Sequence, residues 1–266
     1  INRLTFTGKQ YNFLLPNNAL FMPKTLTGVT AATGSLCIAL DGGNTSFLMR
    51  SASGVGKFYF DRYPTDEAES QSIVPYQVII ENFMFHGLAG ATGCRIASTK
   101  QSTFRNLFFR TFDTGLILQF CLSATVDTVK YFGCTTTGAL FTDGTWSGAT
   151  SSSSVTQVTV INPYVTVNIG ADGLQFINTD SCNVIGGVFE NSVLGRSAVY
   201  VRQTSTTVCK DFRIRGSHIE QNYSEAAIAI DAQDIGIVTV EDIFQQNVDY
   251  LVSLNNVSGT NRVVIK

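Results

Sequence analysis

The chain repeats a degenerate pattern every 22 to 32 residues, from about residue 76 to its last residue. Each copy contains two or three short alternating apolar runs, separated by Gly, Asn, Thr or Asp. One such unit cannot bury its own apolar face, because burial requires a neighbouring unit on each side. The repeat therefore predicts a stacked, solenoid-like architecture.

The alternation within each copy has a period of two residues, which is typical of strands and not of helices. In one copy, Phe212 and Ile214 are expected to point inward while Arg213 and Arg215 face water. Helical spacing is poor nearly everywhere, and a leucine-rich LxxLxLxxN pattern is absent. We therefore predict an all-β parallel β-helix with three short strands per coil. At about 4.8 Å per coil, the seven clearest copies would form a rod on the order of 35 Å long.

Composition narrows the class of protein. Of the 266 residues, 44% are apolar and only 14% are charged, and the net charge is −2. Low charge with many Ser, Thr and Asn favours neutral polar partners and argues against nucleic acid, which calls for a basic face. The longest apolar stretches are too short to span a bilayer, so we expect no membrane insertion.

Metal and cofactor chemistry finds little support in the sequence. The six cysteines include no CxxC pair, and the chain has only two histidines. Zinc and iron–sulfur sites need closely spaced ligands, so we expect no metal and no cofactor. The P-loop and GxSxG motifs are absent as well, which argues against nucleotide binding and serine hydrolysis.

We expect one continuous elongated domain with two parts. Residues 1–75 are less regular and predict irregular N-terminal coils with an inserted loop, whereas residues 76–266 form the main β-helix. Because residue 1 is Ile, we expect the chain to be a fragment or a processed product.

Three segments carry a resemblance to a known family: STFRNLFFRTFDTGLILQF, GALFTDGTWSGATSSSS and CKDFRIRGSHIEQN. With the coils around them, over roughly residues 75–256, they resemble the pectate-lyase-type right-handed β-helices of bacteriophage tailspikes and tail fibres. The resemblance implies a right-handed β-helix and a homotrimeric viral protein, on the virion surface (tail) or extracellular. It also implies recognition, and often cleavage, of a bacterial surface polysaccharide.

Stacked coils bring equivalent residues into columns along the rod, so the register predicts a candidate site. Phe189, Ile219 and Phe244 are expected to form an inward column. Glu190 and Glu220 then lie side by side in the neighbouring outward column, with backbones about 4.8 Å apart.

The outward column offers a chemistry for splitting a glycosidic bond. Two carboxylates this close favour one protonated acid and one ionised base or nucleophile, so we predict Glu190 and Glu220 as a catalytic pair. The same register adds Gln245 at one end of the column, and His86 and Arg110 at the other.

Four further side chains are candidates for substrate binding: Arg110, Asp143, Trp146 and His218. His218 shares a strand face with Glu220 and could support a general base. Asp143 is a second-choice acid whose alternative role is turn formation. Trp146 lies in a Gly/Ser-rich insertion, where it could stack on a sugar, pack on a neighbouring chain or cap its own loop.

Two functions from different classes remain open on the sequence. One is an endo-acting hydrolase or lyase that depolymerises a bacterial surface glycan. The other is a non-catalytic adhesin or structural spike, in which the outward Glu side chains are solvated or balanced by a base such as Arg213 or Arg215. A cellular pectate lyase that uses calcium is a third alternative, disfavoured because the Asp residues do not visibly cluster. Fold alone cannot choose among them, because function depends on the site.

The register also predicts packing. Asn82 and Asn106 should occupy matching turns, because Asn tolerates a left-handed backbone. We expect a set of aliphatic and aromatic residues to lie inside: Phe104, Leu107, Phe109, Leu116, Leu118, Val126, Val129, Phe141, Leu174, Phe176, Val184, Phe189, Val199, Val201, Phe212, Ile214, Ile219, Ile228, Ile230, Val238, Val240 and Ile243.

Overall fold

The structure of the protein is a computed structural model. Before Ile79, it describes only the backbone of the strands. The described residues are 3–7, 11–15, 20–21, 35–41, 47–51, 57–60, 77–81, 84–86, 92–143, 155–166, 172–190, 195–204, 209–220, 223–232, 235–256 and 262–266.

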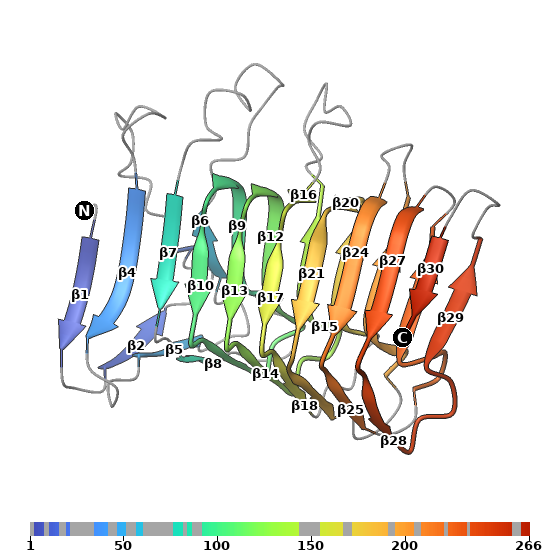
Figure 1. Cartoon of the computed structure of the whole chain (residues 1–266). Coiled ribbons are helices and arrows are strands. Elements are labelled where there is room, and N and C mark those ends of the chain that lie inside the picture. Colours follow the sequence, from blue (N-terminus) through green and yellow to red (C-terminus); the bar gives the residue numbers. More distant parts are fainter. Residues whose placement is uncertain are drawn as a thin grey trace.

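The described residues form thirty strands, which build three long sheets around one core (Figure 1). Sheet A contains β1 (Arg3–Thr7), β4 (Ser35–Asp41), β7 (Gln77–Glu81), β10 (Thr103–Arg105), β13 (Thr125–Asp127), β17 (Thr159–Ile161), β21 (Cys182–Ile185), β24 (Cys209–Arg215), β27 (Ile235–Glu241) and β30 (Arg262–Ile265). Sheet B contains β2 (Tyr11–Leu15), β5 (Phe47–Ser51), β8 (Met84–His86), β11 (Phe108–Arg110), β14 (Lys130–Phe132), β18 (Tyr164–Thr166), β22 (Val188–Glu190), β25 (His218–Glu220) and β28 (Phe244–Gln246). Sheet C contains β3 (Leu20–Phe21), β6 (Lys57–Phe60), β9 (Thr92–Lys100), β12 (Thr114–Leu122), β15 (Thr137–Thr142), β19 (Asp172–Ile177), β23 (Ser197–Arg202), β26 (Ile228–Asp231) and β29 (Val252–Asn255), with β16 (Val155–Thr156) and β20 (Thr179–Asp180) beside it.

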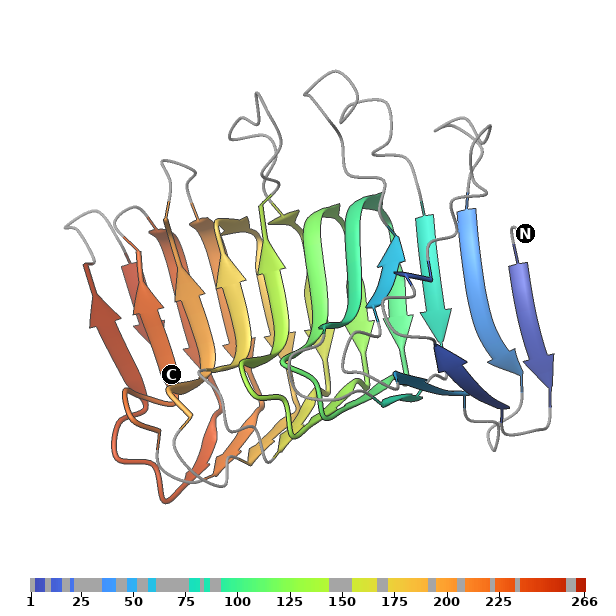
Figure 2. The ribbon, with the colours of Figure 1, turned by 180° about the vertical axis from the view of Figure 1, so that it is seen from behind.

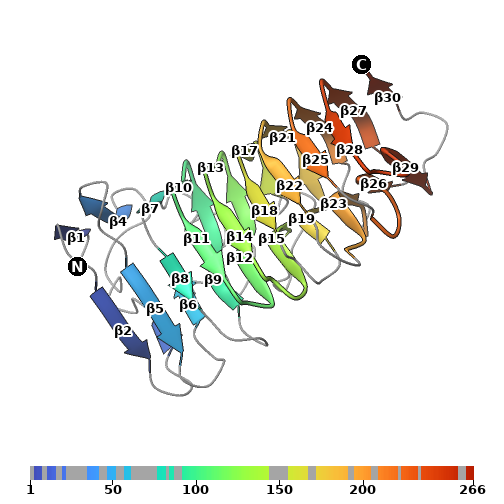
Figure 3. The same ribbon diagram turned by 90° about the horizontal axis from the view of Figure 1, so that it is seen from below.

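Each coil passes through sheets A, B and C in turn, and neighbouring strands are parallel. Sheet A runs downward at the front of Figure 1, sheet B crosses below, as Figure 3 shows from that side, and sheet C runs upward at the back, which faces the viewer in Figure 2. The chain thus descends at the front and ascends at the back of Figure 1 while it advances from the N label to the C label. This sense of rotation makes the solenoid right-handed. The prediction of a right-handed parallel β-helix is confirmed. Strands β1 to β6 pair into the same three sheets, and the boundary at residue 76 stays a prediction.

The corner between sheet A and sheet B is a two-residue connection that recurs from coil to coil. Its first residue has a positive φ of 47° to 67°, a left-handed conformation that Gly, Asn and Asp adopt most readily. The residues at this corner are Asn106, Thr128, Asn162, Gly186, Gly216 and Asp242. Hydrogen bonds between coils continue through it, because the Asn106 amide donates to the Asp127 carbonyl at 2.9 Å and the Lys130 amide to the Leu107 carbonyl at 2.8 Å. The turn predicted at Asn106 is confirmed, and Asn82 lies outside the described residues.

The core contains a stack of aromatic rings from the central positions of sheet B. Phe85 and Phe109 stack with centroids 4.8 Å apart, and Phe109 and Tyr131 with centroids 5.7 Å apart. A column of glycines at the start of the sheet C strands faces this stack. A Cβ atom on Gly138 would lie 3.0 Å from Tyr131 Cγ and 2.6 Å from the Gly173 carbonyl oxygen of the next coil. The glycines therefore supply the room that the rings occupy.

The predicted packing agrees closely with the structure. Of the residues predicted to lie inside, all are buried except Ile243, which is half-buried and packs against the core. Arg213 and Arg215 face solvent, as the alternation requires. Tyr131 is fully buried, and its hydroxyl has no hydrogen-bond partner among the described residues. Burial raises the pKa of that phenol well above its ordinary value.

We predict that Gly138→Ala lowers the free energy of unfolding by about 1 to 3 kcal/mol, because the added methyl group meets backbone that cannot move away. Gly133→Asn is the control. A Cβ atom there has nothing within 4 Å, and Asn tolerates the positive φ, so we expect a change within about 0.5 kcal/mol. Urea denaturation followed by circular dichroism measures both variants. Equal stability of Gly138→Ala and wild type would contradict the described packing.

Candidate functional site

The outer surface of sheet B presents two columns of side chains. In β11, β14, β18, β22 and β25 the central residue is buried, so the first and third residues point outward. Strand β28 continues both columns through its pairing with β25. The first positions, from β11 to β28, are Phe108, Lys130, Tyr164, Val188, His218 and Phe244. The third positions are Arg110, Phe132, Thr166, Glu190, Glu220 and Gln246. We call these twelve residues the sheet B face.

Glu190 and Glu220 occupy directly paired positions on β22 and β25. Phe189 and Ile219, the residues before them, pair in the core and are fully buried. Both glutamates are partly exposed, and the Glu220 side chain retains 29% of its accessible surface. The predicted neighbourhood of the two carboxylates is therefore present in the structure, whereas their catalytic role stays a proposal.

Tyr164, in the coil before Glu190, connects to the pair. Its hydroxyl donates a hydrogen bond of 2.9 Å to Glu190 Oε2. This bond is the main reason why the pKa of Tyr164 is raised, and partial burial and the charge of Glu190 add to it. The charge of Glu220 raises that pKa further, and a hydrogen bond with Thr166 opposes the rise. Three coils thus contribute to one electrostatic cluster.

His218 lies beside Glu220 on β25, as the sequence predicts for positions two residues apart. Its Nε2 atom is 2.8 Å from Glu220 Oε1, but the two atoms are not aligned for a hydrogen bond. The contact therefore becomes an ion pair when the imidazole is protonated. On its other side, the ring meets Phe244 edge-on, with centroids 4.7 Å apart.

Arg110 occupies the third position of β11. It lies three coils before Glu190 in the same column, about 14 Å away along the axis. Its exposed guanidinium lies over the Phe132 ring, 5.6 Å from the centroid, and Lys130 is exposed next to it. His86 pairs with Arg110 in the backbone register. The prediction that His86 and Arg110 continue the column is confirmed, and this end of the sheet B face is basic while the other is acidic.

The predicted column was wrong at its C-terminal end. Phe244 pairs with His218 and points outward, 61% exposed, and Gln245 takes the position paired with Ile219. Gln246, and not Gln245, therefore follows Glu220 in the outward column. The reason is the length of the corner at Asp242, which fixes the register whatever the apolar content of the strand that follows.

Two other predicted residues do not join this site. Asp143 follows β15 in sheet C, where its carboxylate accepts hydrogen bonds of 3.0 Å from Asn178 Nδ2 and from Thr142 Oγ1. It is held in a local network away from the sheet B face. Trp146 lies outside the described residues.

The structure contains a cluster of charged residues on sheet C that was not predicted from the sequence. Arg196 binds the buried Asp172 through Nε, at 3.1 Å, and through a second guanidinium nitrogen, at 2.5 Å. The same guanidinium lies 3.8 Å from the centroid of the Tyr200 ring. Asp172 also accepts hydrogen bonds from Ser197 and Gln175. These groups satisfy one another across two coils, so we interpret the cluster as structural.

Two features are absent from the described residues. No helix there is long and apolar enough to cross a membrane. No three His, Cys, Asp or Glu side chains in the same residues gather closely enough to hold a metal ion.

Comparisons with known proteins concern the fold. No protein-family model matches the chain, and no curated protein matches it. ORF18 of Geobacillus virus E2 is 13% identical, with a TM-score of 0.53 over 99% of this chain and 53% of that one. The pectate lyase Pel9A is 13% identical, with a TM-score of 0.45 over 97% and 70%. An alginate lyase from Paenibacillus sp. str. FPU-7 is 10% identical, with a TM-score of 0.41 over 96% and 100%.

At 13% identity, the likeness to ORF18 extends to the fold and not to the function. With the sheet topology, it defines the class of the chain: a pectate-lyase-like right-handed parallel β-helix protein.

We predict that Glu190→Gln lowers the pKa of Tyr164 toward its ordinary value, because the variant removes the negatively charged hydrogen-bond acceptor. Glu220→Gln should lower it less. Glu241→Gln, an outward glutamate on sheet A, is the control and should leave it unchanged. NMR titration of ring-labelled tyrosine, assigned with Tyr164→Phe, measures the values.

The sign of the linked stability follows from the raised pKa. The Tyr164 contact contributes stability below the ordinary phenol range, near pH 10, and loses it as the pH rises toward the folded-state value. A Tyr164 pKa that is the same in Glu190→Gln and wild type would contradict the hydrogen bond.

Proposed function

We propose that the protein binds a bacterial cell-surface polysaccharide along the sheet B face and depolymerises it there. The observation that carries the proposal is the pairing of Glu190 with Glu220 within an outward row of aromatic and hydrogen-bonding side chains. Six successive strands contribute to this face, so it extends about 24 Å along the axis. That length accommodates several sugar units of an extended chain.

The chemistry of the face supports glycan binding. Phe132 and Tyr164 are partly exposed and Phe244 is mostly exposed, so their rings offer apolar surface to the apolar side of a pyranose. Arg110 and Lys130 add hydrogen-bond donors at one end. The aromatic side chains hold the sugar rings while the polar groups orient them.

The pair itself supports cleavage by acid and base or nucleophile. Tyr164 donates a hydrogen bond to Glu190 Oε2, which holds that side chain in place, and we assign Glu190 the role of base or nucleophile. Glu220, the neighbouring carboxyl group, takes the role of general acid and donates its proton to the leaving oxygen. His218 positions Glu220 from the side.

A second candidate function is a non-catalytic adhesin or structural spike. Outward charges elsewhere on this solenoid serve to join coils: Arg105 binds Glu81 at 3.1 Å and Asp127 at 3.3 Å. Glu190 and Glu220 would have a comparable structural role in such a protein, and the sheet B face would bind glycan without cleaving it.

We further propose a homotrimer at the virion surface, in the tail of a bacteriophage, or in the extracellular space. Exposed apolar side chains support contact with another chain near the last coil, because Tyr250 is 69%, Leu254 49% and Ile265 57% exposed. Sedimentation equilibrium tests this proposal. A mass of three chains would support it, and the mass of one chain would overturn it.

We predict that Glu190→Gln and Glu220→Gln each reduce depolymerisation at least about a hundredfold, because each removes a group that handles a proton or attacks the sugar. The purified protein is incubated with capsular polysaccharide and lipopolysaccharide preparations, and the release of reducing ends and the loss of viscosity are measured. Glu241→Gln is the control and should retain wild-type activity.

The same assay separates the two functions. Full activity of Glu190→Gln and Glu220→Gln would remove the pair from the mechanism. Binding of wild type to bacterial cells without release of reducing ends from any preparation would establish the adhesin or spike instead.

A further inference from the structure

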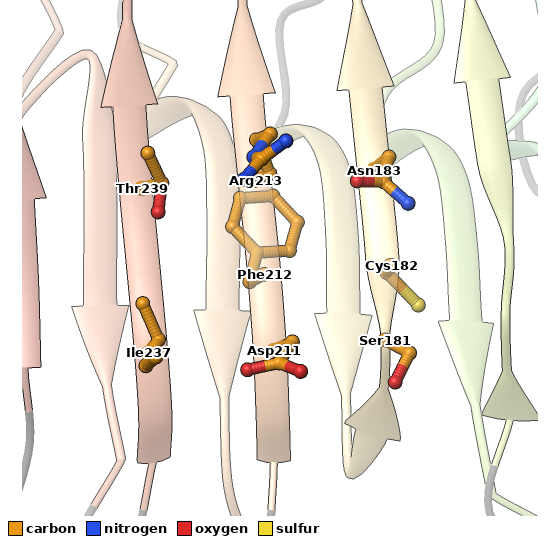
Figure 4. A pocket seen from close by; sticks show the side chains of 8 residues that line it. All are labelled: Ser181, Cys182, Asn183, Asp211, Phe212, Arg213, Ile237 and Thr239. Carbon is orange, nitrogen blue, oxygen red and sulfur yellow. The ribbon is translucent and has the colours of Figure 1, made fainter.

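A second concave surface lies on sheet A. It has a volume of about 400 Å³ and crosses β21, β24 and β27. Figure 4 shows two rows of outward side chains along it: Ser181, Asp211 and Ile237 in one row, and Asn183, Arg213 and Thr239 in the other. Cys182 and Phe212, both nearly buried, lie between the rows. We call this surface the sheet A trough.

The trough contains polar side chains with and without partners. The Ser181 hydroxyl donates a hydrogen bond of 3.1 Å to Asp180 Oδ1. The side chains of Asn183, Asp211 and Arg213 make no hydrogen bond or ion pair with other residues of the described chain. Earlier on the same sheet, by contrast, Arg105 is engaged by carboxylates on both sides. Donors and an acceptor are therefore free on neighbouring coils at this concave place.

The trough also has an apolar wall and no net charge. Ile237 is 42% exposed, although an aliphatic side chain of this size usually avoids water. Asp211 and Arg213 contribute one negative and one positive charge. The occupant that fits is uncharged, has hydroxyl groups that both donate and accept hydrogen bonds, and carries an apolar patch. A sugar ring has these properties.

The repeat of the coils sets the length of the occupant. Side chains of the same row are about 4.8 Å apart along the axis, so three coils span about 10 Å. One pyranose ring is comparable in length to one such step. We propose that the sheet A trough binds a neutral disaccharide unit, with Asp211 accepting from its hydroxyl groups, Arg213 and Asn183 donating to them, and Ile237 contacting the apolar side of a ring.

This site is distinct from the one on sheet B. Sheets A and B are different sides of the solenoid (Figure 3), so a sugar in the trough does not contact Glu190 or Glu220. The trough holds glycan without cleaving it, and its existence does not depend on the proposed catalysis. If both sites act, one polymer or two neighbouring polymers can be held at two places, which increases avidity.

The test uses isotope-labelled protein titrated with maltose, cellobiose, lactose and N,N′-diacetylchitobiose, each to about 50 mM. Backbone amide shifts are followed by NMR. We expect at least one of these sugars to shift residues 181–183, 211–213 and 237–239 with millimolar affinity. Arg213→Ala should weaken that binding about tenfold or more, because it removes a charged hydrogen-bond donor.

Two variants serve as controls. Arg215→Ala removes the same charge from the same strand outside the trough, so it should bind like wild type. In Glu190→Gln, the shifts of residues 181–183, 211–213 and 237–239 should titrate as in wild type, which separates the trough from the sheet B face. The proposal is overturned if none of the four sugars shifts the trough residues, or if Arg213→Ala and Arg215→Ala weaken binding equally.

Discussion

The parallel, in-register stacking of coils is the constraint on which the rest of this structure depends. A strand of three residues in sheet B cannot hold its place alone, so each is fixed by hydrogen bonds to the coils on either side. The corner from sheet A to sheet B keeps this register, because it has the same two-residue length and a left-handed first residue from Asn106 to Asp242. Where Gly186 occupies this corner, a Cβ atom would lie 2.4 Å from Asn162 Oδ1 of the previous coil. A side chain there would require the Asn162 amide to move.

In-register stacking aligns equivalent residues of successive coils in columns, and neighbouring side chains in these columns form the proposed sites. Inside the solenoid, it stacks Phe85, Phe109 and Tyr131 against a column of glycines. Outside, it places Glu190 beside Glu220 and brings Tyr164 within hydrogen-bonding distance of the pair. The sheet A trough arises in the same way, from two rows on three successive coils. Each side chain in such a site is positioned by its own strand, so substitution of one leaves the others in place.

The sequence predicted the fold well, because alternation with a period of two determines which side chains are buried, and a repeat determines what lies next to them. The pairing of Glu190 with Glu220 followed from that rule. The wrong prediction at Phe244 shows the limit of this rule. An apolar residue faces outward where the length of the preceding corner requires it. Contacts set by side-chain rotamers were not predictable either. Three features depend on side-chain conformation. They are the hydrogen bond from Tyr164 to Glu190, the partners of Asp143, and the sheet A trough around Asp211 and Arg213.

The register at the glutamate pair can be measured directly by cross-linking. In a Glu190→Cys, Glu220→Cys double variant, paired positions about 4.8 Å apart are within the Cα separation of a disulfide, about 4.4 to 6.8 Å. Mild oxidation, followed by proteolysis and mass spectrometry, should join residues 190 and 220. The matched variant Glu190→Cys, Gln246→Cys, two coils apart, should not cross-link. A 190–220 bond without the 190–246 bond is the result we expect. Efficient cross-linking of 190 with 246, or none with 220, would contradict the stacking of coils on which both proposed sites depend.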